Sequence, residues 1–311
     1  MPLAVTVLQT ALPVFAALAL GLLCRSRNIL TREGIDTLKK VVLNLTLPFV
    51  LVEAFATAEY TVSAILLPLE MILLCFLALG LGFVVIRLSG MKSRLAPFLA
   101  SGFEAGMLGY ALFVLLFPAR SVSDFALPDI GQTLFVFTIY KILLSGKRDL
   151  KAIWEDMVGT PILWAVAVGV LLGATGLYDW MAQYRLDGIL TSVTSFLSAP
   201  TGTIILLCIG YDLVLKDIPW KKTFWLIAMR LGIMAVCMGV VMVLNRTVLN
   251  GIFFEGAALL MLILPPPYVI PVFADEPSER VQISSALSAM TLVTIVLFAV
   301  MTIIVSSGMI W

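Results

Sequence analysis

The sequence contains no histidine and few charged residues. Lysine, arginine, aspartate and glutamate make up 13% of its 311 residues, whereas about 25% is usual in a soluble domain. Without histidine, the chain lacks the side chain that most often shuttles protons and binds metal ions. The net charge of +1 and the lack of a strongly basic face argue against nucleic acid as a partner.

Cysteine is also scarce, and no nucleotide-binding motif is present. The four cysteines lie far apart in apolar segments without Cys-x-x-Cys spacing, which argues against a zinc site or a disulfide framework. These residues are Cys24, Cys75, Cys208 and Cys237. The chain has no Walker A phosphate loop, so we do not expect it to hydrolyse ATP. We therefore expect neither a bound cofactor nor a structural metal.

Long apolar runs make up most of the chain. Hydrophobic residues account for 61% of it, and the mean hydropathy is +1.09. A helix needs about 20 mostly apolar residues to cross a bilayer. Ten runs meet this length: residues 5–24, 35–55, 62–88, 95–117, 125–144, 161–177, 189–211, 223–244, 253–273 and 281–307. The sequence therefore predicts an all-α polytopic membrane protein with ten transmembrane helices in a lipid bilayer.

Basic residues are distributed unevenly among the connections between these runs. Sixteen of the 20 lysines and arginines follow odd-numbered runs, and only Arg120, Arg185 and Arg246 follow even-numbered ones. Because cytoplasmic loops are enriched in basic residues, we predict a cell (plasma or inner) membrane protein with both termini on the non-cytoplasmic side. The first run has no basic segment before it and is followed by Arg25 and Arg27, so we interpret it as a retained span.

Two pairs of short motifs recur in the same order in the two halves of the chain. Pro13-Val-Phe-Ala-Ala-Leu-Ala-Leu-Gly21 resembles Pro161-Ile-Leu-Trp-Ala-Val-Ala-Val-Gly169, and Leu45-Thr-Leu-Pro48 resembles Leu197-Ser-Ala-Pro200. An odd number of spans in each half inverts the second half relative to the first. We therefore predict two inverted five-helix repeats, residues 1–150 and 151–311, within one integrated membrane domain. Such inverted repeats are typical of transporters.

The ninth run contains Pro265, Pro266, Pro267 and Pro271 within seven positions. Proline lacks a backbone N–H and clashes with the carbonyl group one turn earlier, so an uninterrupted helix is not expected here. A broken helix at membrane depth survives only inside protein or beside a wet cavity, and it often marks a transporter's binding site. The alternative interpretation is a kinked structural helix.

If the repeat exists, the fourth run should be broken like the ninth. It contains Gly102, Gly106 and Gly109, which weaken a helix, and Glu104, which places a carboxyl group in the apolar run. Glycines at this spacing also favour close helix packing, which is the alternative. Ionisable groups inside a membrane are costly and usually functional. We therefore predict that helices 4 and 9 are both broken.

Several of these segments resemble the auxin efflux carrier family, which includes bacterial carboxylate permeases and is related in fold to bile acid/sodium symporters. The segments are Leu12 to Gly21 with the basic turn after it, Val42-Leu-Asn-Leu-Thr-Leu-Pro48, Gly106-Met-Leu-Gly109, Asp129-Ile-Gly-Gln132 and Leu264 to Ala274. The resemblance implies that the broken helices cross at the midplane beside the substrate site. It also implies organic-anion transport by an elevator-like or rocking motion, often as a homodimer.

The chain departs from this family pattern near the expected crossing. Family members often have asparagine where Glu104 stands and proline where Ala111 stands, and they have a second asparagine where this chain has Tyr268 and Val269. In the family, those asparagines help to hold a carboxylate. A glutamate there repels an anion unless the glutamate is protonated or paired with a cation.

Two acidic residues are the predicted coupling sites. A neutral Glu104 could donate a hydrogen bond to a carboxylate and carry a proton, whereas a charged Glu104 could hold Na⁺ with nearby carbonyl groups. Alternatively, Arg230 satisfies this glutamate. Asp129 is either a proton or ion ligand or an interfacial helix cap. For Arg230 we favour pairing with an acid or snorkelling to the surface.

The remaining candidates line the expected crossing or lie near it. Broken-helix N-termini and hydroxyl groups can hold a carboxylate without a full positive charge, although serine and threonine also join helices as ordinary packing contacts. The predicted substrate-binding residues are Asn44, Thr46, Gly106, Gly109, Thr201, Pro266, Pro267 and Tyr268. Glu70 is a reserve candidate, and Glu53 is expected to reach the membrane interface.

Together, the patterns predict a secondary active transporter of small mono- or dicarboxylates, coupled to H⁺ through Glu104, rather than an enzyme. Without histidine or a paired catalytic motif, an intramembrane enzyme is not favoured. One alternative is a Na⁺-coupled transporter of another small solute. The other is a sensor that keeps the transporter fold without flux, since fold does not dictate function.

Overall fold

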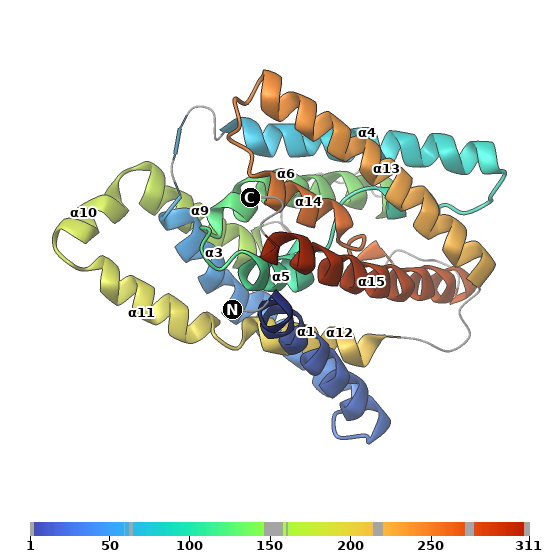
Figure 1. Cartoon of the computed structure of the whole chain (residues 1–311), viewed down its shortest axis with the longest axis horizontal. Helices are drawn as coiled ribbons and strands as arrows, with labels where there is room; N and C mark the ends of the chain where they lie inside the picture. Colours follow the sequence, from blue (N-terminus) through green and yellow to red (C-terminus); the bar gives the residue numbers. More distant parts are fainter. Residues whose placement is uncertain are drawn as a thin grey trace.

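The computed structural model describes residues 3–58, 60–61, 65–145, 158–159, 161–213, 220–270 and 277–307. Every regular element within these ranges is helical (Figure 1). Five segments are long and apolar enough to cross a bilayer: Leu66–Ser89, Ser123–Leu144, Asp187–Asp212, Trp220–Thr247 and Gln282–Ser306. A sixth is obtained if Pro161–Ala174 and Leu177–Gln183, bent by 63°, form one span. These helices support a polytopic membrane protein, whereas the ten-span inverted repeat stays a prediction.

The first predicted spans correspond to α1 (Leu3–Ser26) and to a continuous stretch made of α2 (Arg32–Val41), η1 (Val42–Thr46) and α3 (Leu47–Ala56). The hydroxyl group of Thr31 caps α2 by accepting a hydrogen bond from the Gly34 N–H at 3.1 Å. In η1 the Leu47 N–H donates to the Val42 carbonyl five residues back. This wider π turn comes directly before Pro48, which has no N–H to continue an α-helical pattern.

Two predicted spans are interrupted in the structure. The fourth consists of η3 (Ala96–Ala100), η4 (Ala105–Gly109) and α5 (Tyr110–Leu116), with non-helical backbone at residues 101–104. The ninth begins as α14 (Glu255–Ile263), and the backbone at residues 264–270 after it forms no α-helix. Both interruptions are buried in the protein, where their polar backbone groups need partners other than water.

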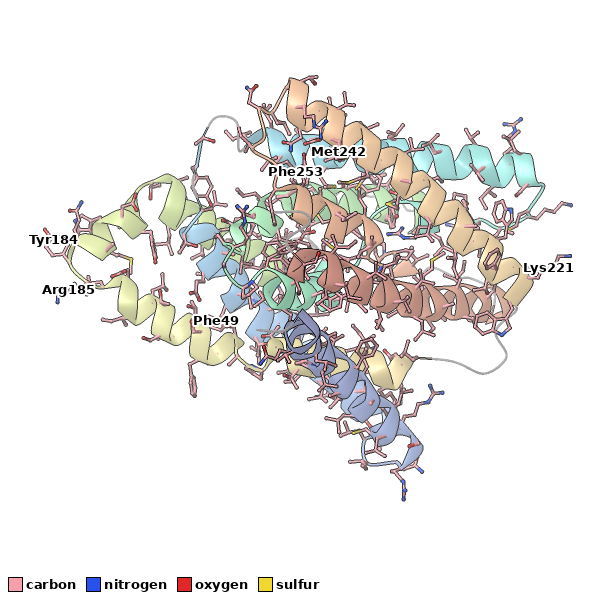
Figure 2. The ribbon with its side chains drawn as sticks, in the orientation of Figure 1. Phe49, Tyr184, Arg185, Lys221, Met242 and Phe253 are labelled. Atoms are coloured by element: carbon pink, nitrogen blue, oxygen red, sulfur yellow. The ribbon has the colours of Figure 1, made fainter. Side chains whose placement is uncertain are left out.

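The other helices are α4 (Leu66–Ser89), α6 (Ser123–Phe135), η5 (Val136–Tyr140), α7 (Lys141–Ser145), α9 (Pro161–Ala174), α10 (Leu177–Gln183), α11 (Asp187–Ser198), α12 (Thr201–Asp212), α13 (Trp220–Thr247) and α15 (Pro277–Ser306). Helix α4 packs against α6, η3 and α13, and α13 packs against α14. Helix α1 packs against α12, and α3 packs against α9 and α11 (Figure 1). Tyr184 and Arg185, between α10 and α11, lie at the opposite end of the molecule from Lys221 (Figure 2).

Glycines bring the backbones of α1 and α12 into direct contact. A Cβ atom on Gly21 would lie 2.1 Å from the Leu207 carbonyl oxygen, and one on Gly210 would lie 2.1 Å from the Leu18 carbonyl oxygen. Helix α9 approaches α3 in a similar way, because a Cβ on Gly169 would lie 2.8 Å from the Val52 carbonyl oxygen. Small residues allow this close packing, which is a main source of helix association in membranes.

Replacing Gly21 with alanine should weaken the α1–α12 contact. The added methyl group has no room beside the Leu207 carbonyl, so one backbone must move, and overpacking of this kind costs roughly 1–3 kcal/mol. Gly80→Ala is the matched control, because a Cβ on Gly80 of α4 would meet nothing within 4 Å. Thermal unfolding in detergent should show a lower melting temperature for Gly21→Ala alone. Equal melting temperatures for the two variants would contradict this packing.

Polar contacts fasten one end of α12 to the α1–α2 turn. The carboxylate of Asp212 pairs with Arg32 and Lys39 of α2. Arg25 of α1 donates to the Leu213 carbonyl at 2.9 Å, and the Tyr211 hydroxyl donates to the Leu30 carbonyl at 3.2 Å. The end of α12 is thus joined to residues about 180 positions earlier in the chain.

Candidate functional site

The two helix interruptions lie against each other and are joined by hydrogen bonds. The Glu104 N–H donates to the Pro265 carbonyl at 2.9 Å. In return, the Tyr268 N–H donates to Oε2 of the Glu104 carboxylate at 2.7 Å. Gly102 has a φ of +61°, and a Cβ on it would lie 3.1 Å from Pro267 Cγ. A glycine is therefore required at this contact for two reasons, its backbone conformation and the lack of space.

Arg230 of α13 binds the backbone of both interruptions. Its side chain is buried, with 3% of the residue exposed. Nη1 donates to the Leu99 carbonyl at 2.8 Å, and Nη2 donates to the Gly102 and Leu264 carbonyls at 2.9 and 2.7 Å. The prediction that Arg230 snorkels or pairs with an acid is wrong, because its described hydrogen bonds go to main-chain carbonyl groups. Its planar fork of five donors suits three acceptors that converge from two chain segments.

Hydroxyl groups bind further carbonyl groups at the two interruptions. The Tyr140 hydroxyl is placed to donate to the Phe98 carbonyl at 2.8 Å and the Ser101 carbonyl at 2.6 Å. The Thr294 hydroxyl donates to the Ile263 carbonyl at 2.6 Å. Sequence reasoning missed Tyr140 and Thr294, because each contact joins neighbouring spans across 31 to 42 residues and no local motif marks it.

Asp129 lies in the interior of α6 and is 6% exposed, so the alternative of an interfacial helix cap is wrong. Its Oδ2 accepts a hydrogen bond from the Tyr110 hydroxyl at 2.9 Å, and its Oδ1 accepts one from Gln132 Nε2 at 3.2 Å. Gln132 Nε2 also donates to the Phe103 carbonyl at 2.9 Å. This polar chain connects Asp129 to the backbone next to Glu104.

A cavity of about 800 Å³ lies between α1, α3, α5, α11 and α12. Its polar wall residues include Glu53, Tyr110, Ser195, Ser198 and Thr201. The sequence places Glu53 at the membrane interface, but its Oε2 accepts a hydrogen bond from the Thr194 hydroxyl at 2.5 Å in the wall of this cavity. Glu53 is therefore a candidate that sequence reasoning passed over. Of the residues described along the wall, none is lysine or arginine.

The predicted substrate-binding residues do not all meet at one place. Pro266, Pro267 and Tyr268 lie at the second interruption, next to Gly102 and Glu104 of the first. Gly106 and Gly109 follow on η4, where a Cβ on Gly109 would lie 2.6 Å from the Phe125 ring. Pro271 lies outside the described residues.

Three other residues remain apart from the crossing or lack a partner. Asn44 is exposed and is not among the cavity residues. The buried hydroxyl groups of Thr46 and Thr201 have no hydrogen-bond partner among the described residues, and Thr201 lines the cavity. Both carboxyl oxygens of Glu70 are likewise buried without a described partner. Within the described ranges, no three side chains of the metal-binding types come together.

Comparison with known proteins gives one informative relative. No family model matches the chain. Over 212 residues, 66% of this chain and 67% of the relative, it is 25% identical to a protein from Methanothermobacter thermautotrophicus named an uncharacterized transporter. This likeness supports a membrane transporter in general and suggests a role other than catalysis. The chain is therefore a helical, multi-pass membrane protein that is similar to a transporter.

Proposed function

We propose that the protein is a secondary active transporter of small organic anions, of the auxin efflux carrier type, and that it couples transport to protons. The observation that carries this proposal is the hydrogen-bonded contact of two interrupted helices, with the Glu104 carboxylate between them. Interrupted helices at membrane depth place backbone dipoles and carbonyl groups beside a substrate. A carboxyl group at that point can take up and release a proton within the transport cycle.

The packing supports two bodies that could move relative to each other. The scaffold body comprises α1, α2, α3, α9, α11 and α12, and the crossing body comprises α4, η3, η4, α5, α6, α13 and α14, whereas α15 packs against both. In the cavity wall, α5 belongs to the crossing body, whereas α1, α3, α11 and α12 belong to the scaffold body. A shift of one body against the other would change access to the cavity. We infer an elevator-like alternating-access motion of this kind.

The glycine contacts support the proposed inverted repeat. Gly21 and Gly169 occupy the same position in the two matching motifs. Gly21 packs on α12 of the second half, and Gly169 packs on α3 of the first half. This reciprocal packing is what a pseudo-two-fold relation between two five-helix repeats would produce. We also propose, from the distribution of basic residues, that both termini lie outside the cytoplasm, and from the family resemblance, that two copies form a homodimer.

An anionic substrate makes a specific demand on this site. Glu53 in the cavity wall and Glu104 at the crossing repel a carboxylate when they are charged, whereas protonated carboxyl groups can donate hydrogen bonds to it. We therefore propose that the anion travels with one or more protons. Na⁺ is the alternative coupling ion.

One observation favours a second candidate substrate class. The cavity wall contains Glu53 and several hydroxyl groups but, among the described residues, no basic side chain. A small cationic or neutral solute would fit such a wall without protonation of the carboxyl group. This candidate keeps the transporter function and changes only the solute.

Flux measurements in proteoliposomes test the proposal. Purified protein should accumulate malonate, malate or indole-acetate under an imposed proton gradient, with saturable kinetics. Uptake driven only by a Na⁺ gradient would show that Na⁺, and not H⁺, is the coupling ion. Uptake only of cations or neutral solutes would favour the second substrate class. Folded protein that binds a solute without flux would instead be a sensor with a transporter fold.

A further inference from the structure

Tyr110 forms a shared wall between two cavities of very different size. On one side is the cavity of about 800 Å³, and on the other is a cavity of about 90 Å³ lined by α3, α5, α6 and α9. The smaller cavity contains Asp129 in its wall, together with Thr133 and apolar residues such as Phe55 and Ile162. Its volume suits a few water molecules, since one needs about 10–15 Å³ of such space. An organic acid fits only the larger cavity.

Tyr110 lines both cavities, and its hydroxyl group is hydrogen-bonded to Asp129 in the wall of the smaller one. Tyr110 is 4% exposed, and its hydroxyl group donates to Asp129 Oδ2 at 2.9 Å. Asp129 Oδ1 is held by Gln132, which is 4% exposed and donates a second hydrogen bond to the Phe103 carbonyl. In this arrangement the Tyr110 hydrogen is committed to Asp129. The hydroxyl then has only lone pairs to offer other groups.

Protonation of Asp129 would reverse this hydrogen bond. A protonated carboxyl group has an O–H donor, so Oδ2 would donate to the Tyr110 oxygen. The Tyr110 hydrogen would then have to find another acceptor, because a buried donor without a partner is costly. A substrate carboxylate in the larger cavity is such an acceptor.

We propose that Tyr110 transmits the protonation state of Asp129 to the larger cavity, so that a carboxylate binds there together with one proton on Asp129. This inference rests on the proposed transport function and assigns one coupled proton to a specific pair of residues, in addition to the proton proposed for Glu104. Tyr110 acts as the positioning residue that links proton site and substrate site.

The charged surroundings of Asp129 come from several packed elements. The nearest other carboxyl group on the crossing is Glu104, which acts on Asp129 electrostatically, and α4 contributes the Cys75 thiol and the carboxyl group of Glu70. Arg230 of α13 lies at the crossing. Helix α3 places Glu53 in the larger cavity, whereas α9 contributes only apolar side chains to the smaller one. Glu104 can therefore change the pH range of the effect, but only Asp129 is hydrogen-bonded to Tyr110.

Calorimetry of malonate binding to full-length protein in detergent tests this proposal. Repeating the titration in buffers of different ionisation enthalpy gives the number of protons taken up per bound malonate. Wild-type protein should take up one proton per bound malonate at pH values where Asp129 of the unliganded protein is ionised, and its affinity should rise there about tenfold per unit decrease in pH. Asp129→Asn offers an amide N–H to Tyr110 and imitates the protonated state, so its binding should be tight and should take up no proton. Tyr110→Phe should bind weakly, again without proton uptake.

Matched controls separate this effect from loss of structure. Asp124→Asn changes a carboxyl group at the start of the same helix, and Tyr184→Phe changes an exposed tyrosine. Both variants should keep wild-type proton uptake. Protons that malonate itself gains or loses contribute equally in every variant, so they do not affect the comparison. Proton uptake that persists in Asp129→Asn and Tyr110→Phe, with carboxylate flux intact in wild-type protein, would overturn the inference and leave the proposed function standing. If wild-type protein neither binds nor transports malonate, malate or indole-acetate, both fail.

Discussion

Glu104→Gln should lower the accumulation driven by a proton gradient about tenfold per pH unit of gradient, while leaving exchange of substrate across the membrane intact. Glutamine keeps a side-chain oxygen that can accept the Tyr268 N–H, so the contact between the interrupted helices survives. What it removes is the group that can gain and lose a proton. We propose that one proton travels on Glu104 and one on Asp129. Each raises accumulation up to about tenfold per pH unit of gradient, so the variant should lose one such factor and keep the other.

Proteoliposomes loaded with or without internal substrate measure these two activities separately. Glu255→Gln, in the first turn of α14, is the matched control and should accumulate substrate like the wild-type protein. Accumulation at the wild-type level in Glu104→Gln would show that Glu104 carries no coupled proton. Glu104→Ala should do more damage, because it leaves the Tyr268 N–H without its partner at a cost of roughly 1–3 kcal/mol.

Arg230→Met should be among the most destabilising single substitutions in this chain. Methionine fills much of the space of the arginine stem but donates no hydrogen bonds to the Leu99, Gly102 and Leu264 carbonyls. Each buried carbonyl left without a partner costs roughly 1–3 kcal/mol. Relief from burying a charge offsets part of this sum, so we expect a net loss of about 3 kcal/mol.

Arg246→Met is the control for this substitution, since Arg246 is exposed in the last turn of the same helix. Thermal unfolding in detergent should distinguish the two variants by many degrees. Arg230→Lys should be intermediate, because an ammonium group offers three donors without the planar fork. A stable Arg230→Met protein would mean that these carbonyls find other partners.

The sequence predicted features whose cause is local. Pro265–Pro267 cannot continue a helix, and Gly102 followed by Glu104 marks an apolar run that is easily interrupted, so both positions could be recognised without knowing their neighbours. The spans could be recognised as apolar segments for the same reason. Five or six of them pass the test of length and composition in the structure.

Features that depend on distant contacts could not be predicted in this way. Arg230 was visible as a basic residue within a span, but its carbonyl partners lie up to 131 positions away in the sequence. The Glu53 carboxylate is bonded to Thr194, which is 141 positions away. Asp129 was expected near the end of a span, because the hydropathy pattern begins at Phe125. The helix begins at Ser123, and folding places this aspartate in the interior against Tyr110.

The contact between Gly21 and α12 also has a consequence for synthesis of the chain. Helix α1 leaves the ribosome before its packing partner around Gly210, which follows about 190 residues later. At about 5–20 residues per second, this interval lasts roughly 10–40 s. Throughout that time the glycine surface of α1 must be covered by lipid or by the insertion machinery. The scaffold body is thus completed only after α12 has been translated.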